Sequence, residues 1–270
     1  MRFALVNDVR VEATPKKKGI CPGCDQSVTA KCGKKRIWHW AHDTKKNCDR
    51  WWETETEWHR SWKNKFPKDW QEFIQHDHKG EKHIADVRTA HGLVIEFQHS
   101  HLKPEERILR ESFYGNMVWV VNGTRLKRDY PRFLKGIEDG YFSPTPIKGH
   151  YLTTLPHVCF PKDWLESTVP VIFDFHETCH SDHAPDMTRE SLWCLLPGRA
   201  EGKAVVIRGE RNSFVEAVSN RKKLFDSLKT INTFAQYIRE QQVRAERELH
   251  QQLIRQSQRS RFRRRRYARF

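Results

Sequence analysis

The sequence predicts an α/β protein whose core is a mixed sheet with helices. Residues 83–89 and 93–98 are two short apolar runs separated by Ala90-His91-Gly92, a pattern that predicts adjacent strands joined by a tight turn. Residues 117–121 form a continuous apolar run, which is typical of a buried strand. One helical pattern precedes these strands and a second interrupts them. The expected order is therefore helix, three strands, helix, strand.

Composition narrows the class of protein and its partners. The chain has 270 residues, of which 37% are hydrophobic, so it can form one large or two ordinary domains. Its net charge of +15 is typical of proteins that bind a polyanion, either nucleic acid or an acidic membrane surface. No apolar run approaches the roughly 20 residues of a membrane span. The N-terminus also lacks the apolar core of a signal peptide, so we expect a soluble, cytoplasmic protein.

Residues 1–50 are expected to form an N-terminal strand, at 3–11, and a zinc knuckle. Zinc prefers four sulfur or nitrogen ligands in a tetrahedron, and Cys-x2-Cys on a tight turn supplies two of them. An odd number of cysteines, seven, also favours metal binding over a disulfide framework. The alternative is a set of reduced structural cysteines beside surface histidines. The predicted ligands of this structural Zn²⁺ are Cys21, Cys24, His39 and His42, with Cys48 as the substitute for either histidine.

Residues 53–66 are expected to form an amphipathic helix. Trp58, Trp62 and Phe66 fall on one stripe at about 100° per residue. Glu55 and His59 lie one turn apart at the edge of that stripe, where they can face a sheet, and Glu57 is expected to face water. The alternative for Glu55 and His59 is an ordinary surface contact between residues four apart.

The strand pair at residues 83–98 holds the most informative polar residues. Asp86 lies in the first strand, and Glu96 and Gln98 share one face of the second because side chains alternate along a strand. Magnesium binds convergent carboxylate oxygens, so an acid beside Glu-x-Gln predicts a site for a hard cation. The alternative is a hairpin whose polar residues are solvated.

The remaining core elements follow in order. A strand is expected at residues 70–78, and Lys103-Pro104-Glu105-Glu106 is a favourable helix start, with proline early and acids in the first turn. Residues 51–130 would thus form the core, followed by a mixed or β-rich module of unknown role at 131–219. Within that module the cluster of His176, Cys179, His180 and His183 is either a second metal site or a polar loop, and we favour the loop.

Residues 220–270 are expected to form a long amphipathic helix with a basic end. Apolar residues recur at a three-to-four spacing from Leu224 to Leu249, which suits either a coiled-coil arm or a helix docked on its own domain. Residues 244–270 contain ten arginines and two glutamates, a net charge of +8. Such a run can pair with phosphates, attract an acidic membrane, or remain an inert tail. We expect nucleic-acid binding through Arg261, Arg263, Arg264, Arg265, Arg266 and Arg269.

Several motifs between residues 20 and 123 resemble the competence protein CoiA-like family, and the core resembles the PD-(D/E)xK, restriction-endonuclease-like fold. The motifs are CPGC, HWAH, ETEWHRSWK, IADV, VIEFQHS and MVWVVNG, in that order. The resemblance implies a nuclease-type centre at Glu55, Asp86, Glu96 and Gln98, with the Cys/His knuckle as a zinc appendage. It also implies bacterial handling of incoming DNA. Gln98 departs from the wider nuclease pattern, in which a lysine is usual at this position.

The expected function is a DNA nuclease that depends on Mg²⁺ or Mn²⁺ bound by Asp86, Glu96 and Glu55. Gln98 would orient the attacking water, with His59 assisting. The alternative is a DNA-binding accessory protein that retains the fold and does not cleave, which the missing lysine favours. A third reading is a scaffold for other DNA-uptake or recombination proteins. Its C-terminal helix would bind those partners or a second copy of the chain.

Overall fold

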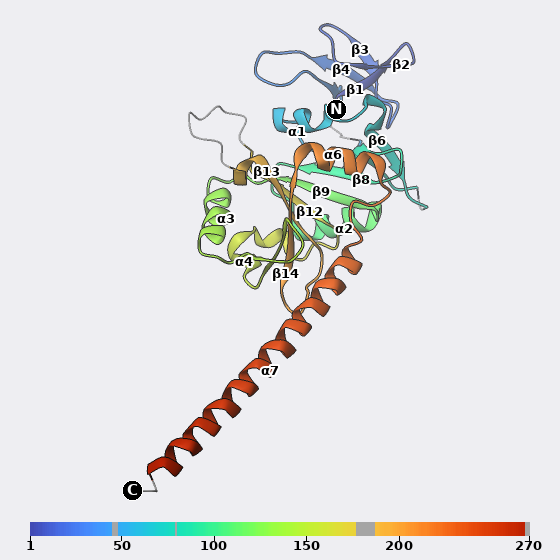
Figure 1. Ribbon diagram of the computed structural model, residues 1–270. Helices are drawn as coiled ribbons and strands as arrows, with labels where there is room; N and C mark the ends of the chain where they lie inside the picture. The colour runs from blue at the N-terminus through green and yellow to red at the C-terminus, as the bar shows by residue number, and fades with distance from the viewer. Residues whose placement is uncertain (45–47, 79, 177–186, 268–270) are drawn as a thin grey trace.

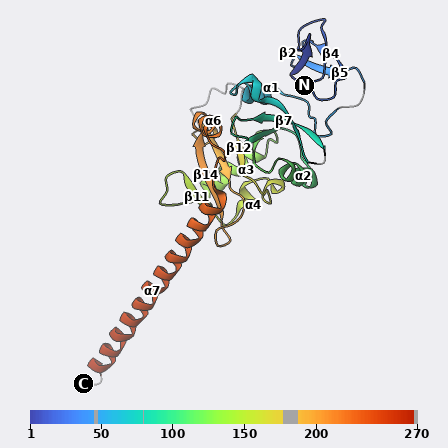
Figure 2. The same cartoon turned by 90° about the vertical axis from the view of Figure 1, so that its right-hand side faces the viewer.

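The computed structural model describes residues 1–44, 48–78, 80–176 and 187–267. Figure 1 shows a small N-terminal sheet, a larger sheet with helices on both faces, and a long C-terminal helix that projects away from the body. The second view, in Figure 2, shows the same projection. Within the described residues, no helix combines the length and the apolar character needed to cross a membrane.

The small sheet has five antiparallel strands in the order β2-β1-β3-β4-β5. The predicted single strand over residues 3–11 is wrong, because Asn7 and Asp8 both adopt positive φ, 51° and 61°, and turn the chain into a hairpin. Two central residues with positive φ match the twist of paired strands, and Asn and Asp tolerate that conformation. The strands are β1 (Phe3–Val6), β2 (Val9–Glu12), β3 (Lys18–Ile20), β4 (Ser27–Lys31) and β5 (His39–His42).

The large sheet has nine strands in the order β10-β11-β14-β13-β12-β9-β8-β7-β6. Three adjacent interior strands, β12, β9 and β8, run parallel, and the other pairs are antiparallel. Strands from residues 71–122 and from residues 143–210 thus share one sheet, and the domain boundaries stay predictions. The strands are β6 (Gln71–His76), β7 (Lys82–Arg88), β8 (Val94–Gln98), β9 (Met117–Asn122), β10 (Ser143–Pro144), β11 (His150–Thr153), β12 (Val171–Asp174), β13 (Ser191–Leu195) and β14 (Ala204–Glu210).

Helices cover both faces of the large sheet, so the structure is mixed α/β, as expected. One core cluster joins Trp62 of α1 and Phe234 of α7 to Ile95 and Phe97 of β8, whereas Trp119 and Phe133 belong to a second cluster. The order α1, β6, β7, β8, α2, β9 is the expected helix, three strands, helix, strand. The helices are α1 (Glu57–Lys63), α2 (Pro104–Tyr114), α3 (Asp129–Glu138), α4 (Pro156–Cys159), α5 (Met187–Glu190), α6 (Arg211–Asn220) and α7 (Ser227–Tyr267), with 3-10 turns at Lys68–Trp70 and Lys162–Trp164.

Helix α1 is shorter than the predicted helix over residues 53–66. It begins after Thr56, whose Oγ1 accepts a hydrogen bond from the His59 backbone N–H at 3.3 Å. In return the Thr56 N–H donates to His59 Nδ1 at 3.4 Å, so His59 takes the part that Glu or Gln usually has in a capping box. Glu55 therefore lies before the helix, not on its face. The stripe of Trp58, Trp62 and Phe66 is buried, and Glu57 is exposed, as predicted.

Helix α7 combines the two alternatives that the sequence left open. Its first part docks on the sheet through Ile231, Phe234 and Ile238, all buried. From residue 239 to residue 257 its residues are exposed, including Leu249 and Leu253. The apolar spacing thus serves docking over the first turns. Arg239 then forms an ion pair with Glu201, and the exposed residues that follow contribute nothing to the buried core.

Candidate functional site

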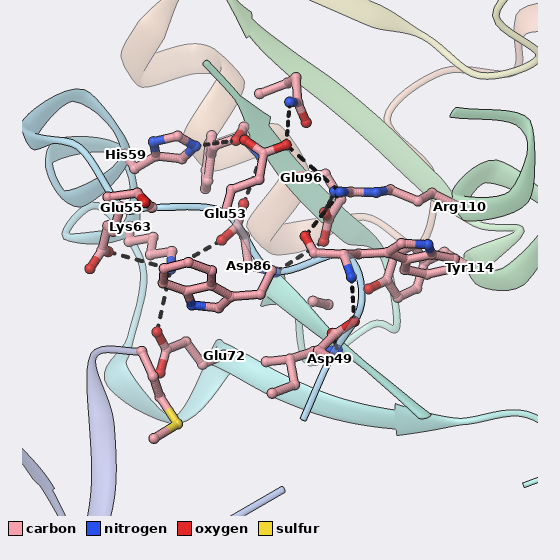
Figure 3. A pocket seen from close by; sticks show the side chains of 18 residues that line it. Asp49, Glu53, Glu55, His59, Lys63, Glu72, Asp86, Glu96, Arg110 and Tyr114 are labelled. Carbon is pink, nitrogen blue, oxygen red and sulfur yellow. Dashed lines mark hydrogen bonds and ion pairs between the residues drawn. The ribbon is translucent and has the colours of Figure 1, made fainter. Parts of the chain in front are cut away.

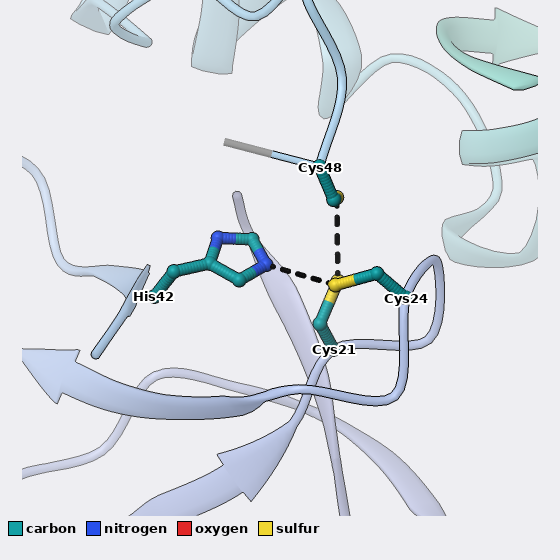
Figure 4. A group of neighbouring side chains, drawn as sticks. All are labelled: Cys21, Cys24, His42 and Cys48. Atoms are coloured by element: carbon teal, nitrogen blue, oxygen red, sulfur yellow. Dashed lines mark hydrogen bonds between the residues drawn. The ribbon is translucent and has the colours of Figure 1, made fainter. Parts of the chain in front are cut away.

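Four ligand side chains gather beside the small sheet, at Cys21, Cys24, His42 and Cys48, and Figure 4 shows them pointing toward one another. Their ligand atoms all lie within 4.8 Å of one another. The Cys21 and Cys48 sulfurs are 3.7 Å apart, and Cys24 Sγ is 3.3 Å from His42 Nε2. Tetrahedral zinc with Zn–S bonds of about 2.3 Å has ligand separations of about 3.8 Å. The geometry and the donor types therefore fit zinc.

The electrostatics of the cluster also suit a metal. The hydrogen bond from Cys48 lowers the pKa of the Cys21 thiol and raises the pKa of the Cys48 thiol. Cys21 is therefore the ligand that is favoured as a thiolate, the form that binds metal. The Cys21 side chain is fully buried against the small sheet. The cluster thus joins the turn after β3, strand β5 and the segment that leads into the core.

His39 is not part of this cluster, and its prediction as a zinc ligand is wrong. It lies in β5 three residues before His42, and side chains an odd number apart on a strand point to opposite faces. His39 Nδ1 instead contacts the Ile37 carbonyl oxygen at 2.8 Å. Cys48, the substitute named from the sequence, takes the fourth place.

The second candidate centre is a cavity of about 80 Å³ between the start of α1, strands β6 to β8, and α2. Figure 3 shows the charged side chains that line it. The five residues predicted from the sequence, which come from separate segments of the chain, all line this cavity: Glu55, His59, Asp86, Glu96 and Gln98.

Asp86 and Glu96 are held at a break in the pairing of β7 and β8. The backbones of the two strands pair at Val87 and Ile95. Beyond these residues, carboxylate side chains accept the strand N–H groups in place of backbone carbonyl groups. Asp86 Oδ2 accepts the Phe97 N–H, and Glu96 Oε1 accepts the Asp86 N–H, each at 3.0 Å. Each carboxylate is thereby fixed by one oxygen, which leaves its other oxygen for a charged partner.

Lys63 of α1, which the sequence analysis did not select, is the partner of Asp86. Its Nζ lies 3.0 Å from Asp86 Oδ1, 3.4 Å from Glu55 Oε1 and 3.6 Å from Glu72 Oε1 (Figure 3). Burial lowers the pKa of Lys63, but the charges of Asp86 and its two companions outweigh it, so the pKa is raised. In the sequence, the one feature that could have pointed to Lys63 as a cavity residue is its position one helical turn after His59.

Glu55 is the most clearly unsatisfied group in the cavity. Its Oε1 is buried and accepts no hydrogen bond, although Lys63 Nζ is nearby. Burial raises its pKa, whereas Lys63 and Arg60 lower it more, and the pKa falls to about 2. Glu55 is therefore ionised at every ordinary pH.

Arg110 of α2 is the second cation that the sequence analysis missed. It is buried, lies 3.3 Å from Glu96 Oε2, and donates to the Trp51 carbonyl oxygen at 3.0 Å. Burial and the neighbouring Asp86 charge raise the pKa of Glu96, and Arg110 offsets only part of this effect. Nothing in the helical pattern of α2 distinguished a buried arginine from an exposed one.

Gln98 and His59 are already engaged by neighbours. The Gln98 amide nitrogen donates to Glu53 Oε1 at 2.5 Å and to Ser100 Oγ at 3.1 Å. His59 Nε2 contacts the Phe97 carbonyl oxygen at 2.5 Å, while its Nδ1 accepts from the helix cap. Both side chains therefore hold the cavity wall in this arrangement.

The three predicted carboxylates do not form a compact ligand group. Among the described residues, the Cys/His cluster alone brings three or more ligand atoms within 4.8 Å of one another. Lys63 Nζ instead stands between Glu55 and Asp86, within 3.4 Å of an oxygen of each. Carboxylate oxygen is the donor that Mg²⁺ and Mn²⁺ prefer, so the donor type fits a hard cation. A metal ion would have to displace Lys63 Nζ to reach these two oxygens.

Two predicted features fall outside what the structure describes. Arg269, Cys179, His180 and His183 lie outside the described residues. Arg261 and Arg263–Arg266 belong to the end of α7, where the backbone alone is described.

Comparison with known proteins supports the N-terminal part of the resemblance. The family model "Competence protein CoiA, N-terminal domain" matches residues 6–50. This range contains most of the small sheet and the whole Cys/His cluster, and it ends before the second centre. No curated protein and no solved structure matches the chain.

Proposed function

We propose that the protein is a cytoplasmic DNA nuclease that depends on Mg²⁺ or Mn²⁺, has a PD-(D/E)xK-type core, and acts in bacterial DNA uptake or recombination. The observation that supports it most is the position of Lys63 between Glu55 and Asp86, beside the β7–β8 strand pair. Lys63 thus brings a lysine to this site, although residue 98, where a lysine is usual, is a glutamine. The match of residues 6–50 to the CoiA N-terminal domain supports a competence-related role.

Five charged residues of the cavity have a role in this proposal. Asp86 and Glu55 would hold the cation through Oδ1 and Oε1 once Lys63 Nζ has moved off these oxygens, and Glu96, paired with Arg110, would complete the acidic wall. When bound, Mg²⁺ or Mn²⁺ supplies a water of lowered pKa and neutralises charge on phosphate oxygens. Lys63, displaced from these carboxylates by the cation, would place its positive charge next to the scissile phosphate. Hydrolysis adds water across one P–O bond and leaves a phosphate end and a hydroxyl end.

The test is DNA cleavage by purified full-length protein in Mg²⁺, Mn²⁺ or EDTA, with Asp86→Ala and Glu55→Gln alongside. Glu105→Gln is the control, because Glu105 is exposed and lines neither this cavity nor the hollows beside it. The proposal expects cleavage with either metal, none in EDTA, and loss of cleavage in the first two variants only. Equal cleavage by Asp86→Ala and the natural protein would contradict it.

A non-cleaving DNA-binding accessory protein is the second candidate function. The observation that favours it is that Gln98, His59 and both oxygens of Glu96 are already engaged by protein groups. It expects DNA binding that persists in EDTA, no cleavage product under any divalent ion, and full function of Asp86→Asn.

A further inference from the structure

Two exposed tryptophans lie beside the acidic cavity. Among the Phe, Tyr and Trp side chains whose exposure the structure describes, Trp38 and Trp52 alone are exposed, at 48% and 44%. Trp52 lines the acidic cavity itself. Trp38 lines a neighbouring hollow of about 740 Å³. Each indole thus offers an exposed aromatic face inside a hollow, where a ligand can cover it.

The hollow beside Trp38 has a net positive charge, because three cations and two carboxylates, Glu55 and Glu57, line it. It lies between the loop of residues 32–38, which connects β4 to β5, and the segment before α1. Lys34, Lys35 and Arg36 are exposed in this loop and form no ion pair with a described residue. Arg60 of α1 donates to the Trp38 carbonyl oxygen at 3.3 Å, which ties the loop to the core.

A second basic hollow, of about 420 Å³, lies at the carboxyl ends of the parallel strands β8, β9 and β12. Arg125, Arg128 and Lys162 are exposed there without a described ion-pair partner. Arg132 pairs with Asp129 at 3.1 Å, yet its Nε is buried and makes no hydrogen bond. Three exposed cations without a described ion-pair partner make this hollow a suitable place for a phosphate group.

The three hollows adjoin one another. Glu55 lines both the hollow beside Trp38 and the acidic cavity. Gln98 lines both the acidic cavity and the hollow at Arg125. The order along this surface is therefore basic and aromatic, acidic, then basic. A phosphodiester chain carries a negative charge at each nucleotide, so its phosphates match both ends of the row, and the acidic middle needs a cation between it and the chain.

We infer that this row binds single-stranded nucleic acid, with phosphates on the two basic hollows and unpaired bases stacked on Trp38 and Trp52. A duplex keeps the faces of its bases stacked internally, so an exposed indole favours an unpaired strand. The inference rests on the proposed function only for the identity of the acidic middle as the cleavage point. Because the strand would continue on both sides of that point, cleavage inside a strand follows.

The test measures binding by fluorescence anisotropy with the full-length chain in EDTA. The probes are an oligothymidine of about 20 nucleotides and a duplex of the same length. We expect tighter binding of the single strand and about tenfold weaker binding by Trp38→Ala, the loss typical of one base–aromatic stack. Trp38→Phe keeps an aromatic face and should stay within about threefold of the natural protein.

The charged side of the row is tested by the double variants Lys34→Ala/Arg36→Ala and Arg125→Ala/Arg128→Ala. Lys135→Ala/Lys148→Ala is the matched control, since it removes the same charge from exposed residues outside all three hollows. Each of the first two should weaken single-strand binding about tenfold more than the control.

The inference would be overturned by equal affinity for the single strand and the duplex. It would also be overturned if Trp38→Ala and both double variants bound the single strand as tightly as the control does. Binding in EDTA needs no cleavage, so the binding result can be interpreted even if the protein does not hydrolyse DNA. Conversely, cleavage that persists in variants with unchanged affinity would support the nuclease and reject the binding row.

Discussion

The protonation state of Lys63 depends on the charged residues around it. A buried lysine without partners would lose its proton, but three carboxylates within 3.6 Å keep this one charged. The same three carboxylates would repel one another without it. Lys63 therefore serves the stability of the cavity and, in the proposed reaction, the electrostatics of the phosphate.

Replacing Lys63 by glutamine is expected to lower the rate of DNA cleavage at least about a hundredfold, the usual loss for a positioned electrostatic group. Lys65→Gln is the matched control, because Lys65 is exposed two residues later. Single-turnover cleavage with Mn²⁺ is the measurement. The melting temperature of Lys63→Gln should also rise more on addition of Mn²⁺ than that of the natural protein, because a cation replaces the lost charge. Unchanged cleavage would contradict the proposed role.

The zinc ligands allow a sharp test at the residue scale. Cys48→Ala and His42→Ala should each lose the bound zinc, whereas His39→Ala should keep it, because His39 faces away from the cluster. Metal analysis of each purified variant gives the zinc content per chain. Retention of zinc by Cys48→Ala together with its loss in His39→Ala would restore the ligand set first expected from the sequence.

Helix α2 is fixed to the sheet by a buried carboxylate. Glu111 accepts hydrogen bonds from the Thr168 N–H at 2.9 Å, Arg107 Nη1 at 2.8 Å and Trp119 Nε1 at 3.1 Å. The same helix carries Arg110, so the position of Glu96 depends on how α2 docks. Burial raises the pKa of Glu111, but these hydrogen bonds outweigh it and the pKa is lowered.

The expected effect of Glu111→Gln is a loss of about 3 kcal/mol in the free energy of unfolding at pH 7, typical of breaking a buried ion pair. The pKa of Glu111 is lower in the folded state, so its stabilisation is complete above the unfolded pKa of about 4.3 and fades as pH falls through the folded value. The difference from the natural protein should thus shrink below pH 4.

Urea unfolding at pH 7 and near pH 3.5 measures this difference, and exposed Glu105→Gln is the control on the same helix. A destabilisation that stays constant between the two pH values would show that the charge of Glu111 is not its source.

At the scale of the whole molecule, charge and core occupy different regions. Residues 244–270 hold ten arginines and two glutamates, a net +8 of the chain's +15. This region follows the last docked residue of α7, Ile238, and the residues from 239 to 257 are exposed. Removing the basic end of α7 should therefore weaken the attraction of DNA without lowering the stability of the fold.

A chain that ends at Gln242 should keep its melting temperature within a few degrees of the full chain, since no core residue is removed. Its affinity for duplex DNA should depend less steeply on salt, because fewer phosphate contacts release counterions. Calorimetry and DNA titrations between 50 and 300 mM salt, roughly the range over which such contacts weaken, test both points. A large drop in melting temperature would mean that the distal helix packs on the body.

Local patterns of the sequence were enough to predict the mixed α/β class, the strand pair of Asp86 and Glu96, and the long helix α7, because periodicity and turn residues act over a few residues. The resemblance to the CoiA-like family, and not local periodicity, grouped Glu55, Asp86, Glu96 and Gln98, which line one cavity whose function stays a proposal. Tertiary structure alone decided that Lys63 and Arg110 turn inward. It also decided that the pairing of β7 and β8 opens at Asp86, and that Cys48 replaces His39. These outcomes depend on which side chains from distant segments share a buried space, and no local pattern encodes that choice.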